Sequence, residues 1–217
     1  MNKVIKSIIF DFDGTLGDTV NVIVNTMQAT IRELELPVRT DRQCSNMIGL
    51  PLTAIPETLF PECENLTGEL YAATYRRLFK DYNKPGEVSL FPNVSDTLQE
   101  LTSRGLTLTI ASSRSHASIV HYVEDLGIDR YISLILGADD VENAKPSPEP
   151  VNITLKHLSI NPQEAIVVGD TKFDILMGKN AGCMACGVTY GNGTRDDLLS
   201  IGADFIFDDL SEILNVI

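Results

Sequence analysis

The chain has 217 residues with the apolar and charged fractions of an ordinary globular protein, enough to bury a core in one or two domains. The formal net charge of −13 argues against nucleic-acid binding, which requires a basic face to neutralise phosphates. No apolar run approaches the roughly 20 residues that span a bilayer, and the short N-terminal apolar run, interrupted by Lys6, is typical of a strand and not of a signal peptide. We therefore expect a cytoplasmic protein without a membrane partner.

The first expected strand ends in two carboxylates. An apolar segment at residues 8–10 runs directly into Asp11 and Asp13, and a Gly14-Thr15 turn follows. Carboxylates two residues apart on an extended strand point to the same side, and two like charges held so close are unfavourable unless a metal ion or a proton compensates them. The pattern predicts a reactive site in which Asp11 is a nucleophile, Asp13 is an acid/base, and a divalent cation lies between them and a phosphate.

Helical patterning follows Asp13. Asp18 is the expected N-cap of a helix whose apolar residues run from Val20 to Leu34 at helical spacing. Shorter helical pieces, broken by prolines, continue over residues 40–82 without a strand pattern, and residues 83–86 have the composition of a linker. We expect residues 17–85 to form a small all-helical module.

A regular alternation of helices and strands begins near residue 90. Strands are expected at 106–111, 132–136, 165–168, 184–189 and 205–207, and helices at 93–104, at 116–126, after Pro148, at 171–181 and at 209–216. Strands separated by helices imply right-handed crossovers and a parallel sheet covered on both faces. The expected fold class is α/β: a doubly wound parallel sheet built from residues 1–16 and 86–217, with the helical module inserted after its first strand.

The ends of the expected strands share one chemistry. Ligands of such sheets bind at the carboxyl ends of the strands, and the residues there suit a phosphate and a hard cation: Asp11, Asp13, Ser112, Ser113, Arg114, Asp170 and Asp174, with Lys145 from a proline-rich loop. Mg²⁺ prefers hard oxygen ligands and usually keeps waters and a phosphate oxygen. A lysine balances phosphate charge and keeps a nucleophilic carboxylate ionised, while a serine hydroxyl donates to a phosphoryl oxygen. Each residue alone has a structural explanation, but the set predicts Mg²⁺-assisted phosphoryl transfer.

The four cysteines predict no metal or redox site. Only Cys183 and Cys186 lie close in sequence, and no second ligand pair exists for zinc. A thioredoxin-like pair opens a helix, whereas Gly182 and Gly187 bracket an expected strand here. We interpret the cysteines as inert, buried thiols.

The motifs and their order resemble those of the haloacid dehalogenase superfamily of phosphohydrolases, and within it the phosphoglycolate phosphatase-like branch. The residues that carry the resemblance are Asp11-Phe-Asp13-Gly-Thr15, Ser112, Lys145 with Pro146, and Gly169-Asp170 with Asp174. The resemblance covers essentially the whole chain. It implies a Rossmann-like core and a helical C1 cap formed by residues 17–85.

The resemblance also implies a role for each motif residue. Asp11 forms a phosphoaspartate, and Asp13 protonates the leaving alcohol, activates the hydrolytic water and binds Mg²⁺ through its main-chain carbonyl. Asp11 and Asp170 are further metal ligands, supported by Asp174 directly or through water. Lys145 bridges the phosphate and Asp11.

The same resemblance places the phosphoryl oxygens against the Ser112 hydroxyl and the Ser113 amide, beside Gly14 and Thr15. It implies a small phosphorylated metabolite as the substrate, with phosphoglycolate as the expectation from the family. Arg114 is the expected contact to a distal anionic group.

Substrate specificity in this superfamily is attributed to the cap. The loop at residues 47–53 is apolar and has no cation. The position at which β-phosphoglucomutases carry a cap histidine falls on Ile23, which disfavours mutase activity. Three other cations are candidates to reach a distal carboxylate or phosphate: Arg76, Arg77 and His116, although His116 is expected to cap the following helix.

Several alternatives stay open at this stage. The same chemistry serves an inorganic pyrophosphatase, a sugar-phosphate phosphatase or a β-phosphoglucomutase-like enzyme. A phospho-acceptor regulatory module is the non-enzymatic alternative, although such modules lack a helical insert and an acid/base two residues after the acceptor. Both a monomer and a homodimer are compatible with the sequence.

Overall fold

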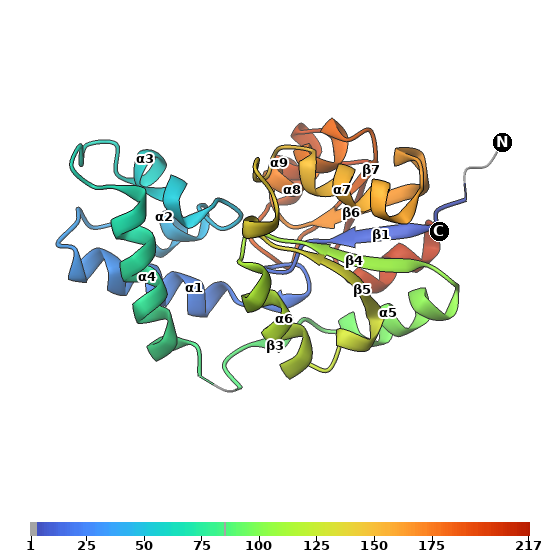
Figure 1. The fold of residues 1–217 in the computed structure, drawn as a ribbon, viewed down its shortest axis with the longest axis horizontal. Helices are drawn as coiled ribbons and strands as arrows, with labels where there is room; N and C mark the ends of the chain where they lie inside the picture. The colour runs from blue at the N-terminus through green and yellow to red at the C-terminus, as the bar shows by residue number, and fades with distance from the viewer. Residues whose placement is uncertain (1–3, 85) are drawn as a thin grey trace.

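The computed structural model describes residues 4–84 and 86–217, which form a parallel sheet between helices and a helical segment beyond one end of that sheet (Figure 1). The sheet has the order β5-β4-β1-β6-β7-β8, and all its pairings are parallel. The strands are β1 (Ser7–Phe10), β4 (Thr107–Ala111), β5 (Ile132–Leu136), β6 (Ala165–Gly169), β7 (Met184–Val188) and β8 (Phe205–Phe207). The expected doubly wound α/β fold is thus confirmed.

Central strand β1 lies at the point where the strand order reverses. It pairs with β4 on one side and β6 on the other, so that Phe10 is opposite both Ile110 and Val168. Because successive crossovers leave this point in opposite directions, the loops after β1, β4 and β6 surround one crevice. The predicted site residues lie in or directly after these loops, except Lys145, which belongs to the segment between β5 and α7.

Helices cover both faces of the sheet (Figure 1). They are α5 (Val94–Ser103) and α6 (His116–Asp125) on one face, and α7 (Glu149–Leu158), α8 (Lys172–Asn180) and α9 (Arg195–Ser200) on the other. Ile8 and Phe10 pack with Leu98 of α5, whereas Ile9 packs with Val151 of α7. Burial on both faces explains why this strand is continuously apolar instead of alternating.

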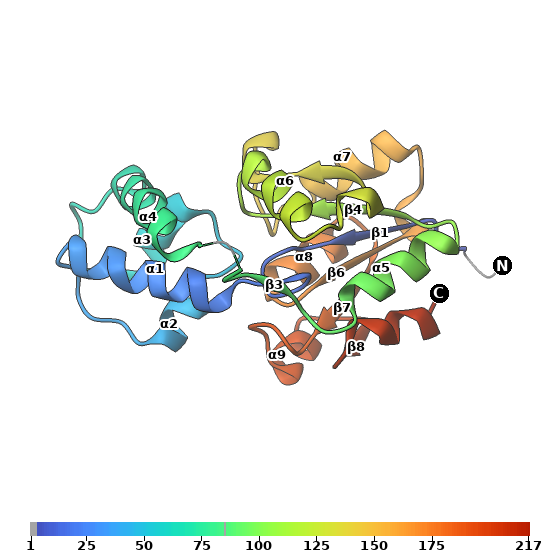
Figure 2. The same ribbon diagram turned by 90° about the horizontal axis from the view of Figure 1, so that it is seen from below.

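The helical segment (residues 20–82) has a small apolar core of its own, which includes Met27, Phe60 and Tyr71. It comprises α1 (Val20–Glu33), α2 (Asp41–Ser45), α3 (Ile55–Leu59) and α4 (Gly68–Tyr82), with the 3₁₀ turn η1 (Leu52–Ala54). Figures 1 and 2 both place it beyond the carboxyl end of β1. Two short antiparallel strands, β2 (Gly17–Asp18) and β3 (Ser89–Leu90), join it to the sheet.

Several local predictions differ from the structure. The pair β2–β3 and helix α9 were not expected, because two-residue strands and a six-residue helix leave little periodicity in a sequence. The expected N-cap Asp18 lies in β2, and Thr19 occupies the N-cap of α1. The expected last helix is instead the 3₁₀ helix η5 (Leu210–Asn215). Pro85 of the predicted linker lies outside the described residues.

The remaining short 3₁₀ helices are η2 (Asp129–Tyr131), η3 (Ala138–Asp140) and η4 (Pro162–Glu164). Within residues 4–84 and 86–217, no helix has the length and apolarity needed to cross a bilayer.

Candidate active site

Three buried carboxylates lie close together at the carboxyl end of β1, and two of them contact one buried ammonium group. The Nζ of Lys145 lies 2.6 Å from Oδ1 of Asp11 and 2.7 Å from Oδ1 of Asp174. One ligand oxygen each from Asp11, Asp170 and Asp174 can be chosen so that all lie within 4.8 Å of one another. We call these four residues the acidic cluster, and none of them is more than 6% exposed.

The sheet register brings the cluster together. Because Phe10 and Val168 are opposite each other on adjacent parallel strands, the residues that follow them emerge side by side. The Asp11 amide donates to the Val168 carbonyl at 2.8 Å and continues the ladder by one bond. Asp174 lies in the first turn of α8, which begins directly after β6.

The acidic cluster carries more negative than positive charge. Burial raises the pKa of Asp11 well above its usual value; the Lys145 ammonium opposes this shift, and the Asp174 and Asp170 carboxylates add to it. Burial and the Asp174 charge raise the pKa of Asp170 to about 7. Burial acts to lower the pKa of Lys145, but the Asp11 and Asp174 charges outweigh it and raise that pKa. Lys145 is therefore cationic, and its charge favours the ionised form of Asp11 against the effect of burial.

The donor set of the cluster fits a hard divalent cation. Asp174 Oδ2 accepts from the amide and hydroxyl of Thr171 at 3.0 and 2.7 Å, and Asp170 Oδ2 accepts from the amide and side chain of Asn192 at 2.7 and 3.0 Å. Among the described residues, no hydrogen bond reaches Oδ2 of Asp11. Free carboxylate oxygens in a site with excess negative charge are the ligands that Mg²⁺ prefers.

Two glycines allow the loops to close around the carboxylates. Gly14 has a φ of +83°, and a Cβ added there would lie 2.2 Å from Oδ2 of Asp170. A Cβ on Gly169 would lie 2.1 Å from the Cβ of Asp174. Gly14, predicted beside the phosphate, thus also lets the loop after β1 approach the loop after β6.

The side chain of Asp13 does not join the acidic cluster. Its carboxylate accepts from Nε of Arg114 at 2.8 and 2.7 Å and from the hydroxyl of Thr19 at 2.6 Å. The two carboxylates do not lie on one extended strand as expected, because β1 ends at Phe10 and the Phe12 carbonyl closes a turn that contains Asp13. Nearby, the Thr15 hydroxyl donates to Oδ1 of Asp170 at 3.4 Å.

Arg114 is a largely buried cation held between aromatic rings. Its guanidinium carbon lies 5.1 Å from the ring centre of Phe79 in α4 and 4.9 Å from that of Tyr122 in α6. One guanidinium nitrogen, Nη2, is buried and has no hydrogen-bond partner among the described residues. This side chain thus has a donor to offer beyond its pair with Asp13.

The two serines after β4 face different partners. Ser112 is buried, and its Oγ accepts from the Arg114 amide at 3.2 Å. The Oγ of Ser113 donates to the carbonyl of Gly49 in the helical segment at 2.6 Å. Ser113, predicted to hold phosphate through its amide, therefore also connects the helical segment to the sheet.

Two of the remaining candidate cations are already paired. The His116 amide donates to Asp139 at 2.6 Å and its Nδ1 lies 2.8 Å from Asp140. Ser115, and not His116, is the N-cap of α6, so the prediction that His116 caps this helix is wrong. Arg77 pairs with Glu33.

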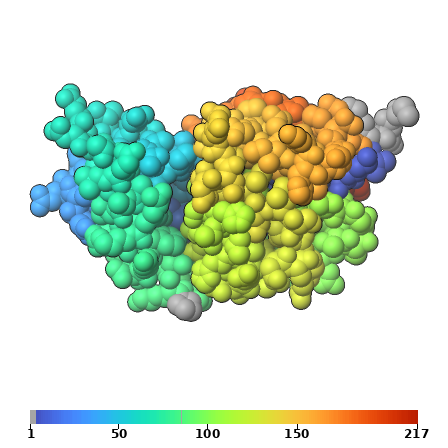
Figure 3. All heavy atoms as spheres, viewed as in Figure 1, coloured from blue at the N-terminus to red at the C-terminus, as the bar shows by residue number. Residues whose placement is uncertain are grey.

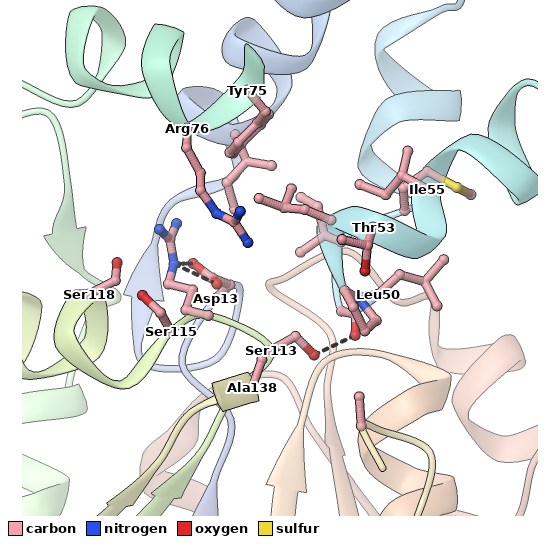
Figure 4. A pocket seen from close by; sticks show the side chains of 18 of the residues that line it. Asp13, Leu50, Thr53, Ile55, Tyr75, Arg76, Ser113, Ser115, Ser118 and Ala138 are labelled. Carbon is pink, nitrogen blue, oxygen red and sulfur yellow. Dashed lines mark hydrogen bonds and ion pairs between the residues drawn. The ribbon is translucent and has the colours of Figure 1, made fainter. Parts of the chain in front are cut away.

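A cavity of about 720 Å³ lies between the helical segment and the carboxyl end of the sheet. Figure 3 shows the surface hollowed between these two parts, and Figure 4 shows the cavity from close by. Asp13, Ser113 and Arg114 line its sheet side. From α4, Arg76 extends into the cavity (Figure 4), and among the described residues it has no ion-pair partner.

Sequence reasoning missed three residues that position the carboxylates: Thr19, Thr171 and Asn192. Asn192 follows β7 within Gly191-Asn192-Gly193, so the rule that sites lie at strand ends would have found it. The two threonines carry no comparable signal, because each also fits an ordinary helix N-cap.

The cysteines form no disulfide in the described part of the chain. Cys44, Cys183 and Cys186 are buried, and Cys63 is partly exposed. Burial raises the pKa of Cys44 and of Cys183 to about 11, and burial with the nearby Asp204 charge raises that of Cys186 to about 12. These values support the interpretation of three inert thiols.

Comparisons with known proteins agree with this geometry. The family model described as haloacid dehalogenase-like hydrolase matches residues 8–188. The chain is 31% identical to a phosphoglycolate phosphatase of Salmonella paratyphi A, over 99% of this chain and 94% of that protein, and 30% identical to the phosphoglycolate phosphatase of Escherichia coli K12, with the same coverage. A haloacid dehalogenase-like family hydrolase from Streptococcus pneumoniae superposes with a TM-score of 0.81 and 29% identity, covering 98% of each chain.

Proposed function

The chain belongs to the haloacid dehalogenase-like hydrolase family and is a phosphatase, and from that premise we propose that it hydrolyses small phosphomonoesters with Mg²⁺ through a phosphoaspartate on Asp11. The observation that carries the proposal is the acidic cluster, in which three buried carboxylates face one ammonium group. Such an excess of buried negative charge is unfavourable unless a cation compensates it. A bound divalent cation removes that cost and creates a binding site for a phosphate.

We propose that Asp11, Asp170 and the Asp13 carbonyl hold the metal ion. Both oxygens of Asp174 already accept hydrogen bonds, from Lys145 and Thr171, which favours support through water. Mg²⁺ supplies charge neutralisation and polarises a phosphoryl oxygen. The remaining chemistry belongs to side chains of this protein.

In the proposed reaction, an Asp11 oxygen attacks phosphorus in line with the leaving oxygen. The bond from phosphorus to the leaving oxygen breaks, and Asp13 gives that oxygen a proton. Water then attacks phosphorus, its proton passes to Asp13, and the bond from phosphorus to Asp11 breaks to release inorganic phosphate. Lys145 and Ser112 donate to phosphoryl oxygens throughout. Asp13 already lines the cavity. To reach the leaving oxygen, its carboxylate must give up its hydrogen bonds from Arg114 and Thr19.

The names of the relatives and two guanidinium groups support phosphoglycolate as a substrate. Arg114 has a buried donor without a partner, and Arg76 extends into the same cavity. A carboxylate on the leaving group suits these donors. Residues 17–85 act as the cap in this proposal, because the cavity lies under the helical segment.

The alternatives differ in what fills the cavity. Pyrophosphate also suits two guanidinium groups, and sugar phosphates suit polar walls. A β-phosphoglucomutase-like reaction is not favoured, because Ile23 lines the cavity where those enzymes carry a histidine. A regulatory phospho-acceptor is not favoured either, because the cavity beside Asp13 has room for a substrate.

Phosphate release by the wild type and by Asp11→Asn, with Mg²⁺ or with EDTA, tests the proposal. The panel contains phosphoglycolate, glucose 1-phosphate, glucose 6-phosphate, pyrophosphate and p-nitrophenyl phosphate. We expect EDTA-sensitive release that falls at least about 10³-fold in the variant, while the melting temperature does not fall. Turnover by Asp11→Asn near the wild-type rate would refute the nucleophile, and a stable phosphoaspartate without release would favour the regulatory module.

A further inference from the structure

The helical segment presents an apolar wall to the cavity. Its side chains come from α1, from the loop after α2, from α3 and from α4, and they are Ile23, Met27, Ile48, Leu50, Ile55 and Tyr75. We call the part of the cavity that these side chains line the apolar chamber. Figure 4 shows Leu50, Ile55 and Tyr75 directed into the cavity, across from Asp13.

The cavity is larger than the proposed small substrate requires. Its volume of about 720 Å³ lies within the range of roughly 300–1,000 Å³ that is typical of pockets for drug-sized ligands. At about 30 Å³ per molecule in the liquid, this volume corresponds to roughly two dozen waters. A two-carbon leaving group would leave most of the apolar chamber in contact with water, which is unfavourable.

Contacts between the helical segment and the sheet hold the chamber over the catalytic residues. The Ser113 hydroxyl donates to the Gly49 carbonyl at 2.6 Å, in the loop that carries Ile48 and Leu50. A Cβ added to Gly49 would lie 2.9 Å from the Phe173 ring at the start of α8, so this loop lies directly against the sheet domain. The chamber therefore shares one cavity with Asp13, the proposed acid/base, and with Ser113 and Arg114 from the loop after β4.

Charged groups line the cavity from both the helical segment and the sheet side, whereas the six side chains of the apolar chamber carry no charge. Arg76 and Lys80 come from α4, and Arg114 comes from the loop after β4 and lies between its two rings. Asp139 and Glu142 line the sheet side. A leaving group that fits this distribution has an anionic group near Arg114 and an apolar body against the chamber.

We propose that the preferred substrate is a phosphomonoester whose leaving group carries an aryl or branched alkyl body larger than glycolate, seated in the apolar chamber. This inference rests on the proposed phosphomonoesterase function. It narrows the substrate class to amphipathic phosphate esters and assigns their apolar part to Leu50 and its neighbours.

A matched ester series tests the inference. The substrates are 2-phosphoglycolate and its α-butyl and α-phenyl derivatives, which keep the scissile bond and the carboxylate and differ only in apolar size. Burial of one additional methylene lowers the dissociation constant about fourfold. We expect kcat/KM to rise at least about tenfold from phosphoglycolate to the α-phenyl ester. A flat or falling series overturns the inference.

A pair of variants locates the effect. Leu50→Asn introduces a polar group into the chamber, and Leu70→Asn makes the same change at an exposed position of α4 outside the cavity. We expect Leu50→Asn to lower the ratio of kcat/KM for the α-phenyl ester to that for phosphoglycolate at least about fivefold. Leu70→Asn should leave that ratio unchanged. Equal ratios in both variants would show that the chamber does not contact the substrate.

Binding of phosphonates separates this inference from the proposed hydrolysis. Methyl-, butyl- and hexylphosphonate have no scissile ester bond, and their Kd for the Mg²⁺-loaded wild type is measured by calorimetry. We expect Kd to fall by about threefold or fourfold for each added methylene. A steep series without phosphate release from any ester keeps the chamber and refutes the hydrolysis. A flat series with phosphate release from esters refutes the chamber and keeps the hydrolysis.

Discussion

Nε of Arg114 lies 2.8 and 2.7 Å from the two carboxylate oxygens of Asp13. The pair joins the loop after β1 to the loop after β4, and both side chains are largely buried. Both residues line the cavity in which the proposed leaving group must also lie. The arginine is therefore placed to contact both the proposed acid/base and an anionic substrate.

We predict that Arg114→Ala raises KM for phosphoglycolate about tenfold to a hundredfold, because a hydrogen bond to a charged group is lost. The effect on KM for p-nitrophenyl phosphate should be smaller, since that leaving group has no carboxylate. Steady-state kinetics with both substrates measures the difference, and Arg114→Lys serves as the charge-preserving control. Equal increases in KM for the two substrates would remove Arg114 from substrate recognition.

Lys145→Met should reduce both activity and stability. The substitution leaves the carboxylates of Asp11 and Asp174 without their buried counter-charge, so the free energy of unfolding in EDTA should fall by about 3 kcal/mol. Phosphate release should fall at least about a hundredfold, because the donor to the phosphoryl group is lost. Urea unfolding monitored by circular dichroism gives the stability.

Lys179→Met is the matched control for that change. Lys179 pairs with Asp204 at 2.9 Å, but both side chains are about one-third exposed. An exposed ion pair contributes about 1 kcal/mol or less. If the two variants lose the same stability, the ammonium in the acidic cluster is not the counter-charge that we assign.

Asp170→Asn should stabilise the metal-free protein at neutral pH. The pKa of Asp170 is raised to about 7 in the folded state, against an ordinary value near 3.8. A raised pKa means that the folded state binds the proton more tightly than the unfolded state, so stability is lost as pH rises from about 4 through 7. The variant lacks this loss, and its amide oxygen can still accept from Asn192.

The measurement is urea unfolding in EDTA at pH 5 and pH 8. The wild type should lose more stability between these values than Asp170→Asn, by an amount on the order of 1 kcal/mol or more. Added Mg²⁺ should raise the melting temperature of the wild type and not that of the variant. A variant that responds to Mg²⁺ as the wild type does would exclude Asp170 as a ligand.

The sheet and the acidic cluster could be predicted from the sequence because both depend on strong local patterns. Continuous apolar strands separated by helices determine a parallel sheet, and in such a sheet Asp11 and Asp170 lie at the carboxyl ends of adjacent strands. The short pair β2–β3 and helix α9 have too few residues for a periodic signal. Their detection depends on tertiary contacts instead.

Side-chain partners were less predictable than positions. The sequence shows that Asp13 follows Asp11 by two residues, but not that β1 ends at Phe10 and that Asp13 pairs with Arg114. Likewise, the apolar loop at residues 47–53 was recognised, but its role as one wall of a large cavity required the packing of α1 and α4 around it. Both features depend on residues more than 20 positions apart.

Finally, we predict that three of the four thiols react slowly with a disulfide reagent at pH 8. Cys44 and Cys183 have a pKa of about 11, so only about one molecule in a thousand carries either thiolate at that pH, and burial limits access further. Titration with Ellman's reagent should show one fast equivalent, from the partly exposed Cys63, and four equivalents in urea. Cys63→Ser should abolish the fast equivalent.

The slow reactions should accelerate about tenfold per pH unit up to about pH 10, because the thiolate fraction rises in that proportion below the pKa. Fast loss of two thiols in Cys63→Ser would instead indicate an accessible pair at Cys183 and Cys186, and it would restore the redox interpretation.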